Sequence, residues 1–193
     1  MAHQLAPLNT LEAINQRRSV RAFCSKGISR ETVRHLLAAA VRAPTAMHQE
    51  PWAFVVIQDR QLLKSISDRA KPLALAEMQR AQCDAEVLNL FAHPKFNIFY
   101  NAGTLIVICG QIANPAAIAD CWLAAENLML AACAMSLGSC VIGSASAALN
   151  TPPLKAELGI PEEMQALAPI IVGVPEVAGK PSPRKEPRIL CWK

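Results

Sequence analysis

One long apolar segment limits the folds that this chain can adopt. Nearly every residue from Ala116 to Leu137 is apolar, which predicts a helix of about 20 residues. Asp120, Glu126 and Asn127 lie within the segment, and such side chains are costly in lipid. The uninterrupted part is also too short to span a bilayer. We therefore expect a buried central helix of a soluble protein, ended by Gly138.

Apolar, β-rich runs predict the strands that this helix would cover. Three strong runs lie at residues 52–57, 104–109 and 167–174, and a shorter one lies at 139–143. Helical patterns outnumber the strands and do not alternate strictly with them. The expected architecture is α+β, with one sheet surrounded by helices in a single domain, 1–193. The proline-rich tail, 175–193, is expected to be extended over a surface, without a helix.

Capping residues and prolines indicate where the other helices begin and end. Asn9 is followed three residues later by Glu12, which is the pattern of a capping box. Ser29 and Asp59 are expected to cap two further helices. Lys71-Pro72 is expected to interrupt the helix that starts after Asp59.

Charge and cysteine content narrow the possible ligands. The net charge of +4, without a long Lys/Arg tract and with one tyrosine, fits a small anionic ligand better than a nucleic acid. Seven cysteines without a C-x-x-C pair suggest free thiols in a reducing compartment, and they lack zinc or iron–sulfur spacing. No apolar signal core is present at residues 1–8, so a cytoplasmic location is the default expectation.

A basic cluster near the N-terminus is the strongest candidate for ligand binding. Arg17, Arg18 and Arg21 lie within five residues, together with Ser19. Guanidinium groups are planar forks of donors suited to phosphate oxygens. The hypothesis is an anion clamp whose other half is Arg184-Lys185 in the tail. The alternative is a solvated basic turn.

Common catalytic motifs do not occur in this sequence. It lacks G-x-G-x-x-G, G-x-S-x-G and H-E-x-x-H, and its four histidines are widely scattered. Gly138 and Gly143 have the spacing of a phosphate-binding loop, but Ser144-Ala145 follow where Lys and Ser or Thr are required. Phosphate donors without an evident acid, base or nucleophile suit a cofactor that carries the reaction itself, as flavin does.

Five segments, in order, resemble the flavin-dependent nitroreductase family. They are RRSVRAF at 17–23, APTAMHQEPWAF at 43–54, FYNA at 99–102, the stretch from ENL at 126–128 to Gly143, and IPEE at 160–163 with 170–175 and PRK at 183–185. The resemblance implies a mostly antiparallel sheet and a homodimer with FMN at its interface. It also implies hydride transfer from NADH or NADPH to FMN and ping-pong, two-electron reduction of nitroaromatic, quinone or related small-molecule acceptors.

The resemblance also implies which residues bind FMN. Arg17, Ser19 and Arg21 would hold its phosphate and pyrimidine side, with Arg18 close by. The remaining implied ligands are the tail residues Arg184 and Lys185 at the phosphate, the backbone of Val141, Ile142 and Gly143 at the isoalloxazine, and a loop with Met47, His48 and Glu50 reaching in from the other subunit. No metal and no catalytic side chain are implied.

Two positions depart from the family pattern. His48 stands where an asparagine is usual, and Glu50 stands where a glutamine is usual. A neutral histidine can still donate and accept one hydrogen bond each, but its response to pH differs. These departures bear on substrate choice and redox tuning. Two further functions also stay open: a non-catalytic flavin store or sensor, and a relative that uses FMN for another oxidation.

Overall fold

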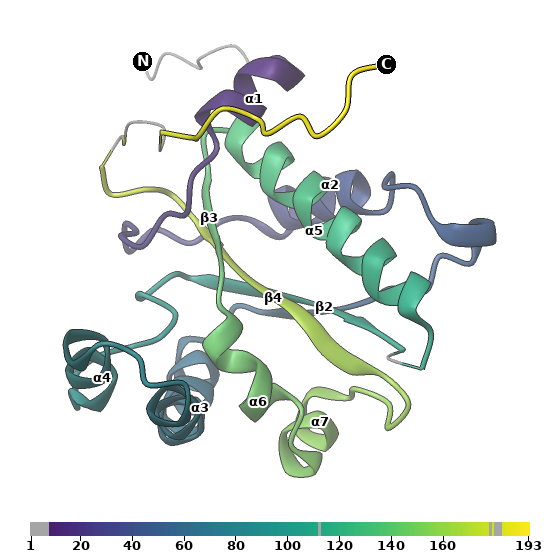
Figure 1. Cartoon of the computed structure of the whole chain (residues 1–193). Coiled ribbons are helices and arrows are strands. Elements are labelled where there is room, and N and C mark those ends of the chain that lie inside the picture. The colour runs from purple at the N-terminus through teal and green to yellow at the C-terminus, as the bar shows by residue number, and fades with distance from the viewer. Residues whose placement is uncertain (1–7, 112, 178, 180–182) are drawn as a thin grey trace.

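A four-stranded antiparallel sheet forms the centre of the molecule (Figure 1). The computed structural model describes residues 8–111, 113–177, 179 and 183–193. Every neighbouring pair of strands is antiparallel, and the strand order is β1-β2-β4-β3. The α+β class and the strand-forming runs are thus confirmed. The strands are β1 (Ala53–Ile57), β2 (Thr104–Gly110), β3 (Gly138–Val141) and β4 (Gln165–Gly173).

Helices cover both faces of the sheet and create two hydrophobic cores. On β2, Leu105 and Val107 point into one core, whereas Ile106 and Ile108 point into the other. This alternation follows from the two-residue period of a strand. One core lies beneath α2 (Arg30–Ala40) and α5 (Pro115–Ala134); the other lies beneath α3 (Arg60–Arg80), α6 (Ser146–Leu149) and α7 (Pro152–Leu158) (Figure 1).

Helix α5 is the long central helix that the apolar segment predicts. Among the described residues, it is the one helix whose length and mean hydropathy of 1.3 would suffice for a membrane span. Its inner face, which includes Ala124 and Leu128, is buried in the core beneath α2 and α5. Its outer face carries Trp122 and Leu123, which are 43% and 46% exposed. Packing against the sheet makes it a core helix with one uncovered apolar face.

The end of α5 differs from the sequence-based expectation. The helix ends at Ala134, and Ser136 takes the left-handed conformation with φ 59°. The Leu137 N–H then donates to the carbonyl of Ala132 at 2.8 Å, which closes the helix end. Gly138, which we expected to stop the helix, is instead the first residue of β3. A serine was sufficient for the turn, and the glycine serves a close packing contact described below.

The expected interruption at Lys71-Pro72 is wrong. Helix α3 runs unbroken from Arg60 to Arg80 with Pro72 inside it. Ile66, Ala70 and Ala74 are buried on one face, before and after the proline. Burial along this continuous face outweighs the lost backbone hydrogen bond, which costs about 3 kcal/mol in an isolated helix.

The remaining helices are short, and their caps follow the sequence. In α1 (Thr10–Gln16) the predicted capping box is present: the Glu12 N–H donates to Asn9 Oδ1, and the Asn9 N–H donates to Glu12 Oε2, both at 2.9 Å. Ser29 and Asp59 cap α2 and α3 as expected. The other elements are α4 (Ala85–Ala92), η1 (Ala46–His48) and η2 (Gly143–Ala145).

Candidate functional site

The basic segment, residues 17–24, lies along the edge of β3. The Val20 N–H donates to the carbonyl of Ser139 at 3.0 Å, and Ser19 forms a parallel β-bridge with Ser139. From this point β3 runs on to its last residue, Val141, and the turn with Ile142 and Gly143 follows directly. Two stretches that were predicted to bind one ligand are therefore neighbours in space, although about 120 residues separate them in the sequence.

Two paired glycines allow the basic segment to approach this closely. Gly138 and Gly173 face each other across β3 and β4. A Cβ atom on Gly138 would lie 2.8 Å from side-chain carbons of Val20, and one on Gly173 would lie 2.9 Å from Phe23. Such distances are too short for carbon atoms, so only glycine fits at either position. Sequence reasoning missed this role because it depends on a contact between distant segments.

Arg17 and Arg18 have different partners within the fold. Arg17 Nε lies 3.4 Å from Glu126 Oε1, and the Arg17 side chain is 21% exposed. This contact uses one nitrogen of the guanidinium and leaves its terminal nitrogens for a ligand. Arg18 Nη2 instead donates to the carbonyl of Val177 at 3.0 Å. Arg18 therefore holds the start of the tail.

Arg21 and Ser19 are exposed on the open side of the segment, and Arg21 has an aromatic neighbour. The Arg21 guanidinium carbon lies 6.0 Å from the ring centroid of Tyr100, within range of a cation–π interaction. Burial raises the pKa of the Tyr100 hydroxyl, the nearby Arg21 acts in the opposite direction, and the Cys140 thiol adds to the rise. Tyr100 takes a left-handed conformation, with φ 51°.

Tyr100 is a residue of the site to which sequence reasoning gave no role. The only signal was its place in the segment FYNA. Its contact with Arg21 depends on how the chain before β2 passes the basic segment, which the sequence does not reveal.

The turn after β3 presents open backbone beside the basic segment. The Ile142 N–H donates to the carbonyl of Pro169 at 2.8 Å, which fixes the turn to β4. Gly143 is exposed, and no atom lies within 4 Å of the position that a Cβ would occupy there. Val141 is half-buried. The turn thus offers a partly apolar surface with open space beside Gly143.

The loop of Met47, His48 and Glu50 lies elsewhere in the same chain. Figure 1 shows it on the opposite side of the fold from the basic segment, near the N-terminal end of α5. Met47, His48 and Glu50 are exposed and have φ values of 54°, 53° and 45°. Each left-handed residue of this kind costs of order 1–3 kcal/mol, so the surrounding structure must hold the loop in place.

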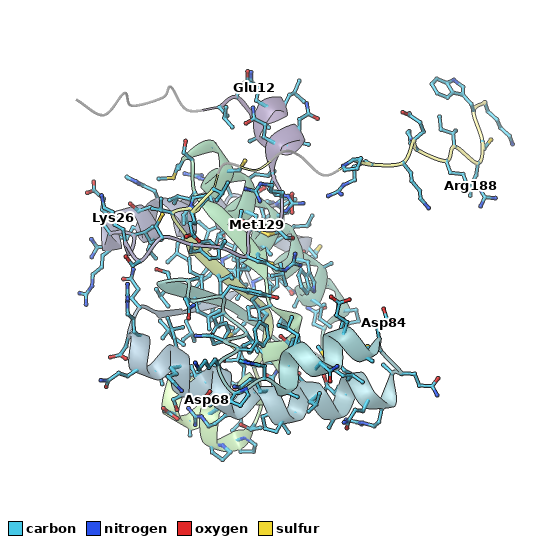
Figure 2. The ribbon with its side chains drawn as sticks, turned by 90° about the vertical axis from the view of Figure 1, so that its left-hand side faces the viewer. Glu12, Lys26, Asp68, Asp84, Met129 and Arg188 are labelled. Atoms are coloured by element: carbon cyan, nitrogen blue, oxygen red, sulfur yellow. The ribbon has the colours of Figure 1, made fainter. Side chains whose placement is uncertain are left out.

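The tail residues Arg184 and Lys185 are exposed and are not packed against the basic segment within the described structure. Arg184 donates to the carbonyl of its neighbour Pro183 at 3.5 Å. In Figure 2 the tail around Arg188 leads away from the body of the fold. Leu190 and Trp192 near its end are 83% and 86% exposed.

The donor set favours an anion over a metal. Within the part of the chain that the structure describes, no group of His, Cys, Asp or Glu could hold a metal ion. Arg17, Ser19 and Arg21 supply N–H and O–H donors of the kind that bind phosphate. A separate cavity of about 270 Å³ lies between α3 and residues 94–102. Its lining includes Asn101 but none of the predicted ligand-binding residues.

The fold and this site together define a class of protein, one that binds a small ligand at the edge of an antiparallel sheet. An antiparallel α+β sheet carries a cationic segment bonded to its edge strand, beside an open backbone turn. Such a site suits a small ligand that combines a phosphate with a flat ring.

Comparison with known proteins identifies the family. The sequence profile of the nitroreductase family matches residues 14–174, and the chain belongs to that family. A protein of Archaeoglobus fulgidus, provisionally named NADH dehydrogenase/NAD(P)H nitroreductase, is 29% identical over 174 residues, which cover 86% of this chain and 85% of the relative. The crystal structure of a Bacteroides fragilis nitroreductase with bound FMN superposes with a TM-score of 0.82; it is 28% identical and covers 96% of this chain and 100% of that one.

A shorter match links the chain to a different activity in other proteins. Mouse iodotyrosine deiodinase 1 is 39% identical over 57 residues, which cover 30% of this chain and 20% of the mouse protein.

Proposed function

We propose that this protein is an FMN-dependent oxidoreductase that reduces nitroaromatic, quinone or related acceptors with NADH or NADPH. The observation that carries the proposal is the hydrogen bond from the Val20 N–H to the Ser139 carbonyl, which joins the cationic segment to the strand leading to Gly143. FMN has both parts that such a site suits, a phosphate and a flat ring. When bound, FMN supplies the two-electron transfer, so no nucleophilic side chain is required.

Different residues of one chain would bind different parts of FMN. Arg17 and Ser19 would bind the phosphate through charge-assisted and neutral hydrogen bonds. Arg21 would lie at the pyrimidine side, where its positive charge favours negative charge on the ring. The backbone of residues 141–143 would lie against the isoalloxazine. Arg184 and Lys185 would complete the phosphate site once the tail is docked.

The same proposal includes a homodimer. Exposed apolar side chains lie on α1 and α5, two helices that pack together: Leu11, Ile14, Trp122 and Leu123. A second copy of the chain would cover this surface and bury these residues. It would also bring the loop with Met47, His48 and Glu50 to the flavin of its partner, since that loop lies away from the basic segment of its own chain (Figure 1).

A titration with FMN, followed by reduction, tests the proposal. We expect the purified protein to retain flavin absorption after incubation with FMN and desalting. NADH or NADPH added under argon should bleach the bands, and a quinone should restore them with steady-state turnover. Retained bands that neither nucleotide bleaches would favour a store or sensor. Failure to bind FMN would refute the assignment.

Substitution of Arg17 tests the phosphate site directly. Arg17→Ala should raise the Kd for FMN about 10- to 100-fold, because hydrogen bonds to charged groups are worth about 1.5–3 kcal/mol. Arg34→Ala is the matched control, since it removes the same charge from the exposed surface of α2. Equal Kd values for the two variants would contradict the role of Arg17.

A further inference from the structure

A buried carboxylate holds the loop around His48. Asp120 on α5 is 5% exposed, and its two carboxylate oxygens accept a forked hydrogen bond from the Ala46 N–H at 3.1 and 3.3 Å. Within the described residues, Ala46 is its one hydrogen-bond donor, and no cation lies in salt-bridge range. A carboxylate is costly to bury with so few partners. We therefore look for a role of Asp120 other than packing.

A second contact joins the same loop to the same helix. Asn114 Nδ2 donates to Gln49 Oε1 at 3.2 Å, while Asn114 Oδ1 caps α5 by accepting from the Ala116 N–H at 3.0 Å. The loop is thus fixed at both of its ends to the first two turns of α5. Between the two contacts lie Met47 and His48, both in the left-handed conformation. Residues in this conformation persist only where neighbouring contacts hold them.

We infer that Asp120 is a positioning residue, which fixes the loop from Ala46 to Glu50 so that His48 is presented to the flavin of the partner subunit. The inference rests on the proposed FMN site and homodimer. Asp120 directs its carboxylate to the loop, whereas Trp122 and Leu123 on the outer face of the same helix would contact the partner. The helix that would form the interface therefore also sets the shape of the loop that crosses it.

Hydrogen exchange tests the anchor without any cofactor. Asp120→Ala removes the acceptor, whereas Asp120→Asn keeps one amide oxygen that can accept from the Ala46 N–H. We expect amide exchange in residues 44–51 to accelerate about 10- to 100-fold in Asp120→Ala and less in Asp120→Asn. Asp68→Asn is the control, because it removes a carboxylate from the exposed surface of α3. Exchange equal to wild type in Asp120→Ala would overturn the anchor.

FMN binding and flavin potential then test the purpose of the anchor. We expect a Kd for FMN raised about tenfold and a shifted midpoint potential in Asp120→Ala, with partial recovery in Asp120→Asn and an unchanged dimer in both. Faster exchange with wild-type Kd and potential would overturn the positioning role. If Asp120→Ala does not fold, Asp120→Asn still decides by the same measurements. A wild-type protein that binds no FMN would refute the proposed function and the positioning role with it, whereas exchange alone would still decide whether Asp120 holds the loop.

Discussion

The substitution Gly138→Ala should separate the basic segment from the sheet. The new methyl carbon would lie 2.8 Å from three side-chain carbons of Val20, a residue that is 5% exposed. Carbon atoms pack at about 3.5–4.0 Å, so the segment must move by roughly 1 Å. Overpacking of this kind costs about 1–3 kcal/mol. The hydrogen bond from Val20 to Ser139 would lengthen with the same movement.

A double-mutant cycle measures whether this contact is the cause. Gly138→Ala and Val20→Ala should each lower the free energy of unfolding in urea, the second by about 2 kcal/mol through lost burial. The double variant should be more stable than the sum of the two costs predicts, because the smaller side chain makes room for the methyl group. Gly27→Ala is the control, since no atom lies within 4 Å of its Cβ position.

The same variants connect packing to ligand binding. If Gly138 allows the cationic segment to lie against β3, Gly138→Ala should weaken FMN binding about tenfold. The double variant with Val20→Ala should recover part of the affinity. If the loss of unfolding free energy in the double variant equals the sum of the two single losses, the steric argument is refuted. Normal FMN affinity in a Gly138→Ala protein that is destabilised would refute the link from the segment's position to the site.

Three further predictions follow from other contacts. Tyr100→Leu should raise the Kd for FMN two- to fivefold through loss of the cation–π contact with Arg21, whereas Tyr100→Phe should retain near-wild-type Kd; equal values would contradict the contact. Burial raises the pKa of the Cys109 and Cys121 thiols from 9.0 to about 11. The folded state keeps both thiols protonated to a higher pH than the unfolded state does. Their contribution to the free energy of unfolding in urea should therefore be constant below pH 9 and fall between pH 9 and 11, by on the order of 3 kcal/mol per thiol, and Cys121→Ala should reduce that fall. Trp122→Glu should convert a dimer to monomers in sedimentation velocity and release FMN; a wild-type monomer would contradict the proposed interface.

The sequence alone determined most of the local structure. Helix starts at Asn9, Ser29 and Asp59 were predictable because a cap depends on residues within one turn. The strand-forming runs and the long helix were predictable because their burial leaves a periodic or continuous apolar pattern. The family was also evident in the sequence, since its motifs are short and keep their order along the chain.

Only the tertiary structure decided how these pieces act together. Pro72 stays within a helix because residues on both sides of it are buried on one face, a fact of packing that a local rule does not contain. Gly138 and Gly173 leave room for the side chains of Val20 and Phe23, and the local sequence does not predict such a contact.

The contacts of the arginines and of Asp120 likewise became visible only in the fold. Arg18 donates to the carbonyl of Val177, and Tyr100 lies beside Arg21, although nothing in the spacing of these residues predicts either contact. Asp120 read as an interruption in an apolar helix, and the structure places it at the Ala46 N–H, 74 positions away in the chain. Local rules describe what one turn or one strand can do, whereas these contacts join segments whose meeting is decided by the packing of the whole sheet.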